Sequence, residues 1–192
     1  MTENEKYISE IKKRLSRERF EHSLEVAKTA AELARRYGAD PEKAYAAGIL
    51  HDIMKDADNE EHLRLFERNS IKLTELEKGA RKLWHAMSSA LYVRERFGIE
   101  DGDILGPIRY HTTGRPEMTT AEKVLFIADF ISADRIYPGV ERMREKAAIS
   151  LELAMVEGLQ FTMAELLNAE EAVHPDMLNA YNELIIKRQE KN

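Results

Sequence analysis

The chain has 192 residues, of which 43% are apolar and 33% are charged, and its formal net charge is −6. A chain of this length suits one domain with a substantial core, since about 70% of its unfolded surface should become buried. The acidic balance argues against general nucleic-acid binding, and the absence of cysteine excludes disulfides and thiolate metal ligands.

The N-terminal segment is charged and lacks the apolar stretch of a signal peptide. No apolar run approaches the roughly 20 residues that a membrane-spanning helix needs. We therefore expect a soluble protein of the cytoplasm that has no membrane partner.

The apolar residues recur with a helical period along almost the whole chain. The pattern predicts helices over the ranges 3–15, 18–37, 41–57, 59–68, 74–97, 101–110, 119–134, 140–171 and 175–190. No alternating strand pattern and no linker interrupts them. The sequence therefore predicts one all-α domain over residues 1–192.

The predicted helix 18–37 turns a histidine and an arginine toward its apolar side. His22 lies at the edge of one apolar stripe, and Arg19 also points inward. An inward arginine requires an anionic partner. His22 by itself fits a hydrogen-bonded core histidine as well as a metal ligand, so both interpretations stay open.

The predicted helix 41–57 carries His51 and Asp52 side by side in an apolar setting. A buried carboxylate needs a partner or a metal ion. Lys55 lies one helical turn after His51, where it would meet a phosphate bound at a metal. The alternative is a structural His–Asp hydrogen bond with an exposed Lys55.

Three more polar residues interrupt apolar segments in the same way. Asp129 breaks the run VLFIADFI, His85 lies in LWHAMSSALYV, and His111 opens a loop that contains glycine and proline. Each has a structural alternative: a salt bridge for Asp129, a core position for His85 and a helix cap for His111. The remaining histidines, His62 and His174, occupy charged or turn segments and are left out of the site.

Taken together, these residues predict a metal site at the centre of a helical bundle. Imidazole and carboxylate ligands favour first-row transition metals. Two divalent ions would outweigh the two carboxylates and leave a positive site that attracts polyphosphate. The predicted ligands are His22, His51, Asp52, His85, His111 and Asp129.

The order of these residues resembles the HD-domain metal phosphohydrolases, whose minimal pattern is a His, a His-Asp pair and a distal Asp. A closer likeness covers about residues 7 to 190. The segments that carry it are RERFEHSLEVA, AGILHDIMKD, HTTGRPEMTTAEKVLFIADFISADR and YPGVE. They resemble the bacterial HD-domain symmetrical diadenosine tetraphosphate hydrolases, the YqeK-type family.

The resemblance implies an HD-domain helical bundle with its metal-ligand core within residues 18–135. It implies a two-metal hydrolase, with iron as the metal and manganese, cobalt or zinc as alternatives, that cuts diadenosine tetraphosphate into two ADP. Asp52 and Lys55 are the predicted catalytic residues. The predicted substrate contacts are Arg19, Lys55, His85, His111, Thr112, Asp129, Asp134, Arg135 and Tyr137.

We expect His22, His51, Asp52 and Asp129 to hold one ion, and Asp52 to bridge to a second ion held with His85 and His111. Two other functions stay open: a different HD-type phosphohydrolase, acting on nucleoside monophosphates or cyclic dinucleotides, and a helical nucleotide-binding scaffold without enzymatic activity. A homodimer is compatible with the sequence.

Overall fold

The structure is a computed structural model that describes residues 2–190, and the described residues form helices and no strand. The predicted all-α fold is therefore confirmed. The helices are α1 (Glu3–Arg14), α2 (Arg17–Tyr37), α3 (Pro41–Leu50), α4 (Asn59–Arg68), α5 (Glu75–Gly79), η1 (Arg81–Leu83), α6 (Trp84–Phe97), α7 (Gly102–Tyr110), α8 (Thr120–Ile131), α9 (Val140–Ile149), α10 (Leu151–Asn168) and α11 (Pro175–Gln189).

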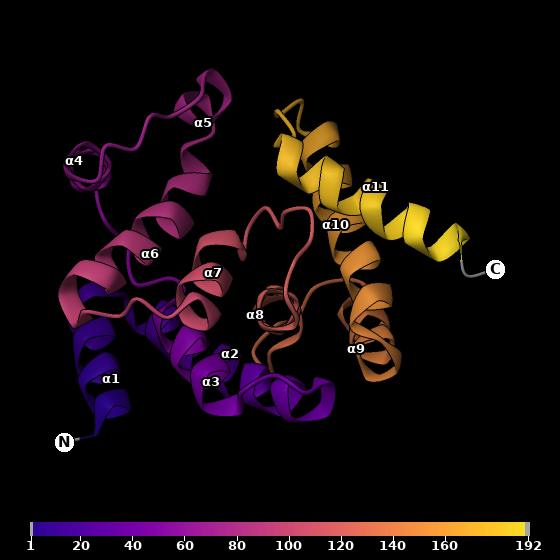
Figure 1. Ribbon diagram of the computed structural model, residues 1–192, viewed down its shortest axis with the longest axis horizontal. Coiled ribbons are helices and arrows are strands. Elements are labelled where there is room, and N and C mark those ends of the chain that lie inside the picture. The colour runs from indigo at the N-terminus through magenta and orange to yellow at the C-terminus, as the bar shows by residue number, and fades with distance from the viewer. Residues whose placement is uncertain (1, 191–192) are drawn as a thin grey trace.

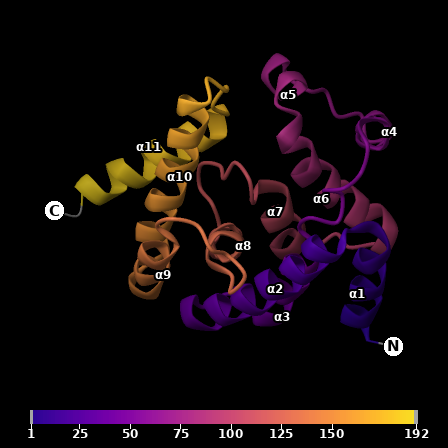
Figure 2. The same ribbon diagram turned by 180° about the vertical axis from the view of Figure 1, so that it is seen from behind.

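Helix α8 forms the middle of the bundle. It packs against α2, α3 and α7 on one side and against α9 and α10 on the other (Figures 1 and 2). Its residues Val124–Ala128 are fully buried, which explains why this segment is apolar all round. None of the helices in residues 2–190 is long and apolar enough to cross a membrane.

Helices α2 and α3 pack closely against each other. A Cβ atom added to Gly48 on α3 would lie only 2.5 Å from the Cα atom of Ala27 on α2. The small residues that precede His51 therefore make room for another helix and not for a ligand. This contact fixes the end of α3, which carries His51 and Asp52, against α2, which carries His22.

The predicted helix 41–57 is wrong in its second half, because α3 ends at Leu50. Residues beyond it form tight turns, in which the Ile53 amide donates to the Leu50 carbonyl and the Lys55 amide donates to the Asp52 carbonyl. These bonds span three residues and not the four of an α-helix. The His-Asp pair therefore lies in a turn and not within a helix.

Three other predicted helices are also shorter than expected. The segment 140–171 divides at Ser150, whose extended backbone ends α9 and whose hydroxyl caps α10 by accepting from the Glu152 amide. The segment 74–97 divides at Ala80 into α5, η1 and α6. The segment 119–134 ends at Ile131, and Ser132 begins the turn that follows.

Candidate metal centre

All six predicted ligands come together from five parts of the fold. His22 lies on α2, His85 on α6 and Asp129 on α8, while the pair His51-Asp52 and His111 directly follow α3 and α7. Donor atoms of five of the six form two groups, within each of which the atoms lie within 4.8 Å of one another, and His85 belongs to neither group. The groups are His22, His51 and Asp129, and His51, Asp52 and His111.

Three of the four imidazoles are oriented by backbone carbonyls. Each ring places Nδ1 at 2.7–2.8 Å from the carbonyl oxygen three residues earlier. A carbonyl can only accept, so Nδ1 must carry the proton and Nε2 must present a lone pair. The three pairs are His51 with Gly48, His85 with Lys82 and His111 with Ile108.

The lone pairs of these three rings converge on one small volume. The Nε2 atoms of His85 and His111 are 3.2 Å apart, and His85 Nε2 is 3.1 Å from Asp52 Oδ1. His51 Nε2 and Asp52 Oδ1 are both buried without a hydrogen-bond partner. Acceptor atoms this close repel one another unless a cation lies between them. The donor set therefore fits a divalent metal site.

Burial and charge set the protonation of this cluster. Burial lowers the pKa of His51 and of His85 to about 4, so both rings are neutral and able to bind metal near pH 7. Burial opposes ionisation of Asp52, but the nearby imidazoles, His51 foremost, outweigh it and hold the pKa of Asp52 well below its ordinary value. The cluster therefore pairs neutral imidazoles with an ionised carboxylate.

The fourth imidazole is held by carboxylates. His22 Nε2 lies 3.0 Å from Asp129 Oδ1, and His22 Nδ1 lies 2.7 Å from Asp134 Oδ2. The side chain of Asp129 is 21% exposed, whereas that of Asp52 is 6% exposed. His22 and Asp129 therefore form the outer, more accessible part of the cluster.

Three side-chain cations surround the donor atoms. Lys55 Nζ is 3.0 Å from His85 Nε2, and Arg135 contacts Asp129 Oδ1 at 2.5 Å. Arg19 lies 3.7 Å from Asp52 and forms an ion pair with Asp56 at 2.9 Å. Arg19 thus has the anionic partners that its inward position requires. Together with Lys55 and Arg135, it places three cationic side chains around the cluster.

Two predicted substrate contacts lie in different settings. Thr112 follows His111, and its buried hydroxyl has no hydrogen-bond partner, so its contact with substrate stays a prediction. Tyr137 instead donates its hydroxyl to the Phe130 carbonyl, and its ring lies 5.1 Å from that of Phe161. Its contact with substrate stays a prediction.

The two histidines left out of the site lie outside the cluster. His62 is buried against Trp84 and hydrogen-bonds Ser88, and His174 caps α11. The carbonyls of Gly48 and Lys82 that orient the ligands were missed, because backbone groups carry no sequence signal. Asp56, which forms the ion pair with Arg19, was also missed.

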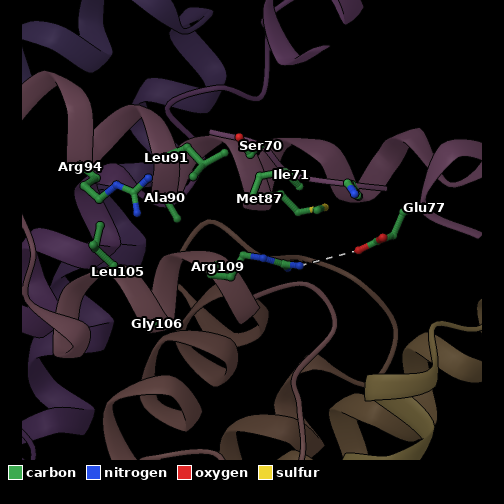
Figure 3. A pocket seen from close by; sticks show the side chains of 11 residues that line it. Ser70, Ile71, Glu77, Met87, Ala90, Leu91, Arg94, Leu105, Gly106 and Arg109 are labelled. Atoms are coloured by element: carbon green, nitrogen blue, oxygen red, sulfur yellow. Dashed lines mark ion pairs between the residues drawn. The ribbon is translucent and has the colours of Figure 1, made fainter. Parts of the chain in front are cut away.

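Two cavities border α6, which carries His85, or the turn η1 directly before it. One, of about 590 Å³, lies between η1 and the α10–α11 connection, and Lys82, whose carbonyl holds His85, lines it. The other, of about 520 Å³, lies between α6 and α7 and contains none of the six ligands. In this second cavity Arg109 faces Glu77 across the opening at 3.8 Å (Figure 3). None of the six candidate ligands lines the first cavity either, and its one link to them is the Lys82 carbonyl that accepts from His85.

The helical fold and this donor cluster define an HD-domain protein, and the family model described as HD domain matches residues 19–134. A solved structure from Clostridium acetobutylicum, described as a predicted HD superfamily hydrolase involved in NAD metabolism, has the same fold. Its TM-score is 0.93 at 31% sequence identity, and the match covers 97% of this chain and 99% of that one.

Comparison with curated relatives shows which family of HD-domain proteins the chain resembles. The chain is 40% identical to the symmetrical bis(5'-nucleosyl)-tetraphosphatase of Halalkalibacterium halodurans, over 96% of this chain and 98% of the relative. It is 39% identical to the protein of the same name from Bacillus subtilis, over 94% and 97%. The chain belongs to this family of HD-domain proteins, as its sequence motifs predicted.

Proposed function

We propose that the chain hydrolyses diadenosine tetraphosphate symmetrically, giving two ADP, with divalent metal ions held by the six-residue cluster. The observation that carries this proposal is the convergence of potential metal-ligand atoms: two Nε2 atoms lie 3.2 Å apart, and His51 Nε2 and Asp52 Oδ1 are buried beside them without a hydrogen-bond partner. The substrate follows from the relatives, which are named symmetrical bis(5'-nucleosyl)-tetraphosphatases. When bound, the ions would supply Lewis-acid activation of water and of the attacked phosphate.

We further propose two ions, with iron as the native metal. The position of Asp52 supports a bridging role: Oδ1 faces His85 and His111 at 3.1 and 3.5 Å, and Oδ2 faces His51 at 3.7 Å. His22 and Asp129 would complete the first ion. Iron rests on the resemblance and on the imidazole-rich donor set, which also accepts manganese, cobalt and zinc.

Side-chain cations would bind the polyphosphate. Lys55 and Arg135 lie on either side of the cluster, and Arg19 lies beside Asp52. A tetraphosphate that approached the cluster would meet all three cations and draw them away from the carboxylates. The candidate cluster contains no serine or cysteine that could serve as a nucleophile, so direct attack by water is favoured over a covalent intermediate.

The cavity beside Lys82 would receive one nucleoside. Its volume of about 590 Å³ lies in the range of small-molecule sites, and apolar side chains such as Leu83, Leu166 and Met177 line it. Lys82 links its wall to His85 through the carbonyl bond of 2.7 Å. That link to His85 is what supports placing a nucleoside in this cavity.

Elemental analysis and a nucleotide panel on one preparation test the proposal. We expect stoichiometric metal and faster turnover of diadenosine tetraphosphate than of nucleoside monophosphates or cyclic dinucleotides. Metal-free protein without hydrolase activity would instead indicate a nucleotide-binding scaffold. Rapid turnover of a monophosphate or a cyclic dinucleotide would reassign the substrate but keep the metal centre. The single-domain organisation, the cytoplasmic location and a homodimer remain predictions.

A further inference from the structure

His22 is oriented differently from the other three histidines. His51 and His111 directly follow helices, and His85 follows the single turn η1, so carbonyls at helix ends are available to their Nδ1 atoms. His22 is the sixth residue of α2, where the carbonyls of the preceding turn accept helical amides. Its Nδ1 atom must therefore find an acceptor elsewhere in the fold.

Asp134 is that acceptor. Its Oδ2 atom lies 2.7 Å from His22 Nδ1, while Asp129 Oδ1 lies 3.0 Å from Nε2 on the opposite edge of the ring. Both carboxylates come from one short stretch, the end of α8 and the turn after it. This stretch therefore contacts His22 at both ring nitrogens.

The turn that carries Asp134 is itself fixed from α9. Arg144 donates to the carbonyls of Ile131, Ser132 and Arg135 at 2.9–3.2 Å. The Arg135 amide also donates to the Ser132 carbonyl at 2.9 Å. Four hydrogen bonds thus hold the backbone on both sides of Asp134, so its carboxylate is aimed at His22 by a fixed backbone.

We infer that Asp134 is a positioning residue for the metal ligand His22 and not a contact for the nucleotide. A carboxylate that accepts from Nδ1–H keeps the lone pair on Nε2, where Asp129 completes the donor pair. It also makes the imidazole a stronger donor. The inference deepens the proposed function, since it assigns a role around one ion of the proposed centre.

Manganese(II) titration, with the free ion followed by electron paramagnetic resonance, tests this role in Asp134→Ala, Asp134→Asn and wild-type protein. Loss of such an outer partner typically weakens metal binding by about 10- to 100-fold, and we expect a loss of this size for one ion in Asp134→Ala. Asp134→Asn should lose less, because its amide oxygen still accepts from Nδ1–H. KM at saturating manganese should stay close to the wild-type value in both variants.

The matched control is Asp103→Asn, an exposed aspartate on α7 whose side chain pairs with Lys43 away from the cluster. It should bind manganese like the wild type. Wild-type affinity together with a raised KM in Asp134→Ala would overturn the inference and make Asp134 a nucleotide contact. Wild-type affinity and an unchanged KM would overturn it as well.

Two further controls distinguish a loss of metal binding in the variant from a loss of folding and from the absence of a metal site. Circular dichroism reports whether Asp134→Ala folds; if it does not, Asp134→Asn decides, with weaker manganese binding in support and wild-type binding against. Wild-type protein that binds no manganese would refute the proposed metal centre, and the inference with it. Manganese binding that Asp134→Ala leaves intact would refute the inference alone.

Discussion

The inner and outer parts of the donor cluster are held in place by different means. In the inner part, His51, His85 and His111 are buried and oriented by carbonyls. In the outer part, His22 lies between Asp129 and Asp134, and the side chain of Asp134 is 35% exposed. Backbone acceptors cannot be removed by substitution, whereas each carboxylate can.

The pKa shifts of the two parts also run in opposite directions. Burial lowers the pKa of His51 and His85 to about 4. Burial would lower the pKa of His22 too, but its hydrogen bonds to Asp129 and Asp134, with the negative charge of Asp129, together outweigh burial and raise it. Burial thus keeps the rings of His51 and His85 neutral, so that each can offer a lone pair to a metal ion. The protonation of His22 depends instead on the charges next to it. We expect substitutions to affect the two parts unequally.

The largest effect should follow from Asp52→Ala, in the inner part. Asp52 faces three imidazoles, so its loss should weaken both ions and abolish measurable turnover. Removal of one electrostatic group at an active site costs about 10²–10³ in kcat, and a shared ligand should cost at least that. Activity and metal content are measured together. Normal turnover with full metal occupancy would rule out the bridging role.

His85→Ala and His111→Ala should separate the two ions. Their Nε2 atoms face each other at 3.2 Å, and neither residue contacts His22 or Asp129 in the pairs described above. Each variant should therefore lose the second ion and retain the first. Metal titration of the two variants beside the wild type measures this. Two tightly bound ions in both variants would show that His85 and His111 do not hold the second ion.

Gly48→Ala tests the close contact between α2 and α3, which holds the backbone of the inner part of the cluster in place. The added methyl would lie 2.5 Å from the Cα atom of Ala27, so α3 must move away from α2. Overpacking of this kind costs about 1–3 kcal/mol in the free energy of unfolding. Urea denaturation measures the loss. Gly102→Ala is the control, since nothing lies within 4 Å of its added methyl. Equal stability of the two variants would count against the close α2–α3 contact.

Arg19→Ala should have the smallest effect. Arg19 pairs with Asp52 and Asp56, and its side chain is 39% exposed, so it lies at the rim of the cluster. Loss of a contact made equally in the ground and transition states raises KM and leaves kcat unchanged. Steady-state kinetics with metal analysis checks both. An unchanged KM would make Arg19 a structural partner of the two aspartates.

The sequence predicted the fold class from the helical period of its apolar residues, and it indicated the candidate ligands because they are local anomalies. Asp129 and the pair His51-Asp52 stand out in apolar segments, where a charge needs a partner. The end of α3 at Leu50 was not predicted, because the apolar period continues through Met54 while the backbone turns. The Ser150 cap, with Glu152 two residues later, was a readable signal that the long apolar period concealed.

Contacts between segments that are far apart in the chain could not be predicted from the sequence. His22 and Asp134 are separated by 112 positions, and nothing near either residue indicates the other. The family resemblance placed Asp134 beside the nucleotide, whereas the structure places its carboxylate against His22. The packing of α8 against α2 creates this contact, and only a three-dimensional structure contains that information.

Hydrolysis of diadenosine tetraphosphate in heavy-oxygen water tests the central claim most directly. Attack by water on one of the two inner phosphorus atoms gives two ADP, and the label enters only one of them. Mass spectrometry of the products from the metal-loaded protein should therefore show one labelled ADP and one unlabelled ADP per turnover. AMP together with ATP would contradict the symmetrical cut, and ADP without label would contradict direct attack by water.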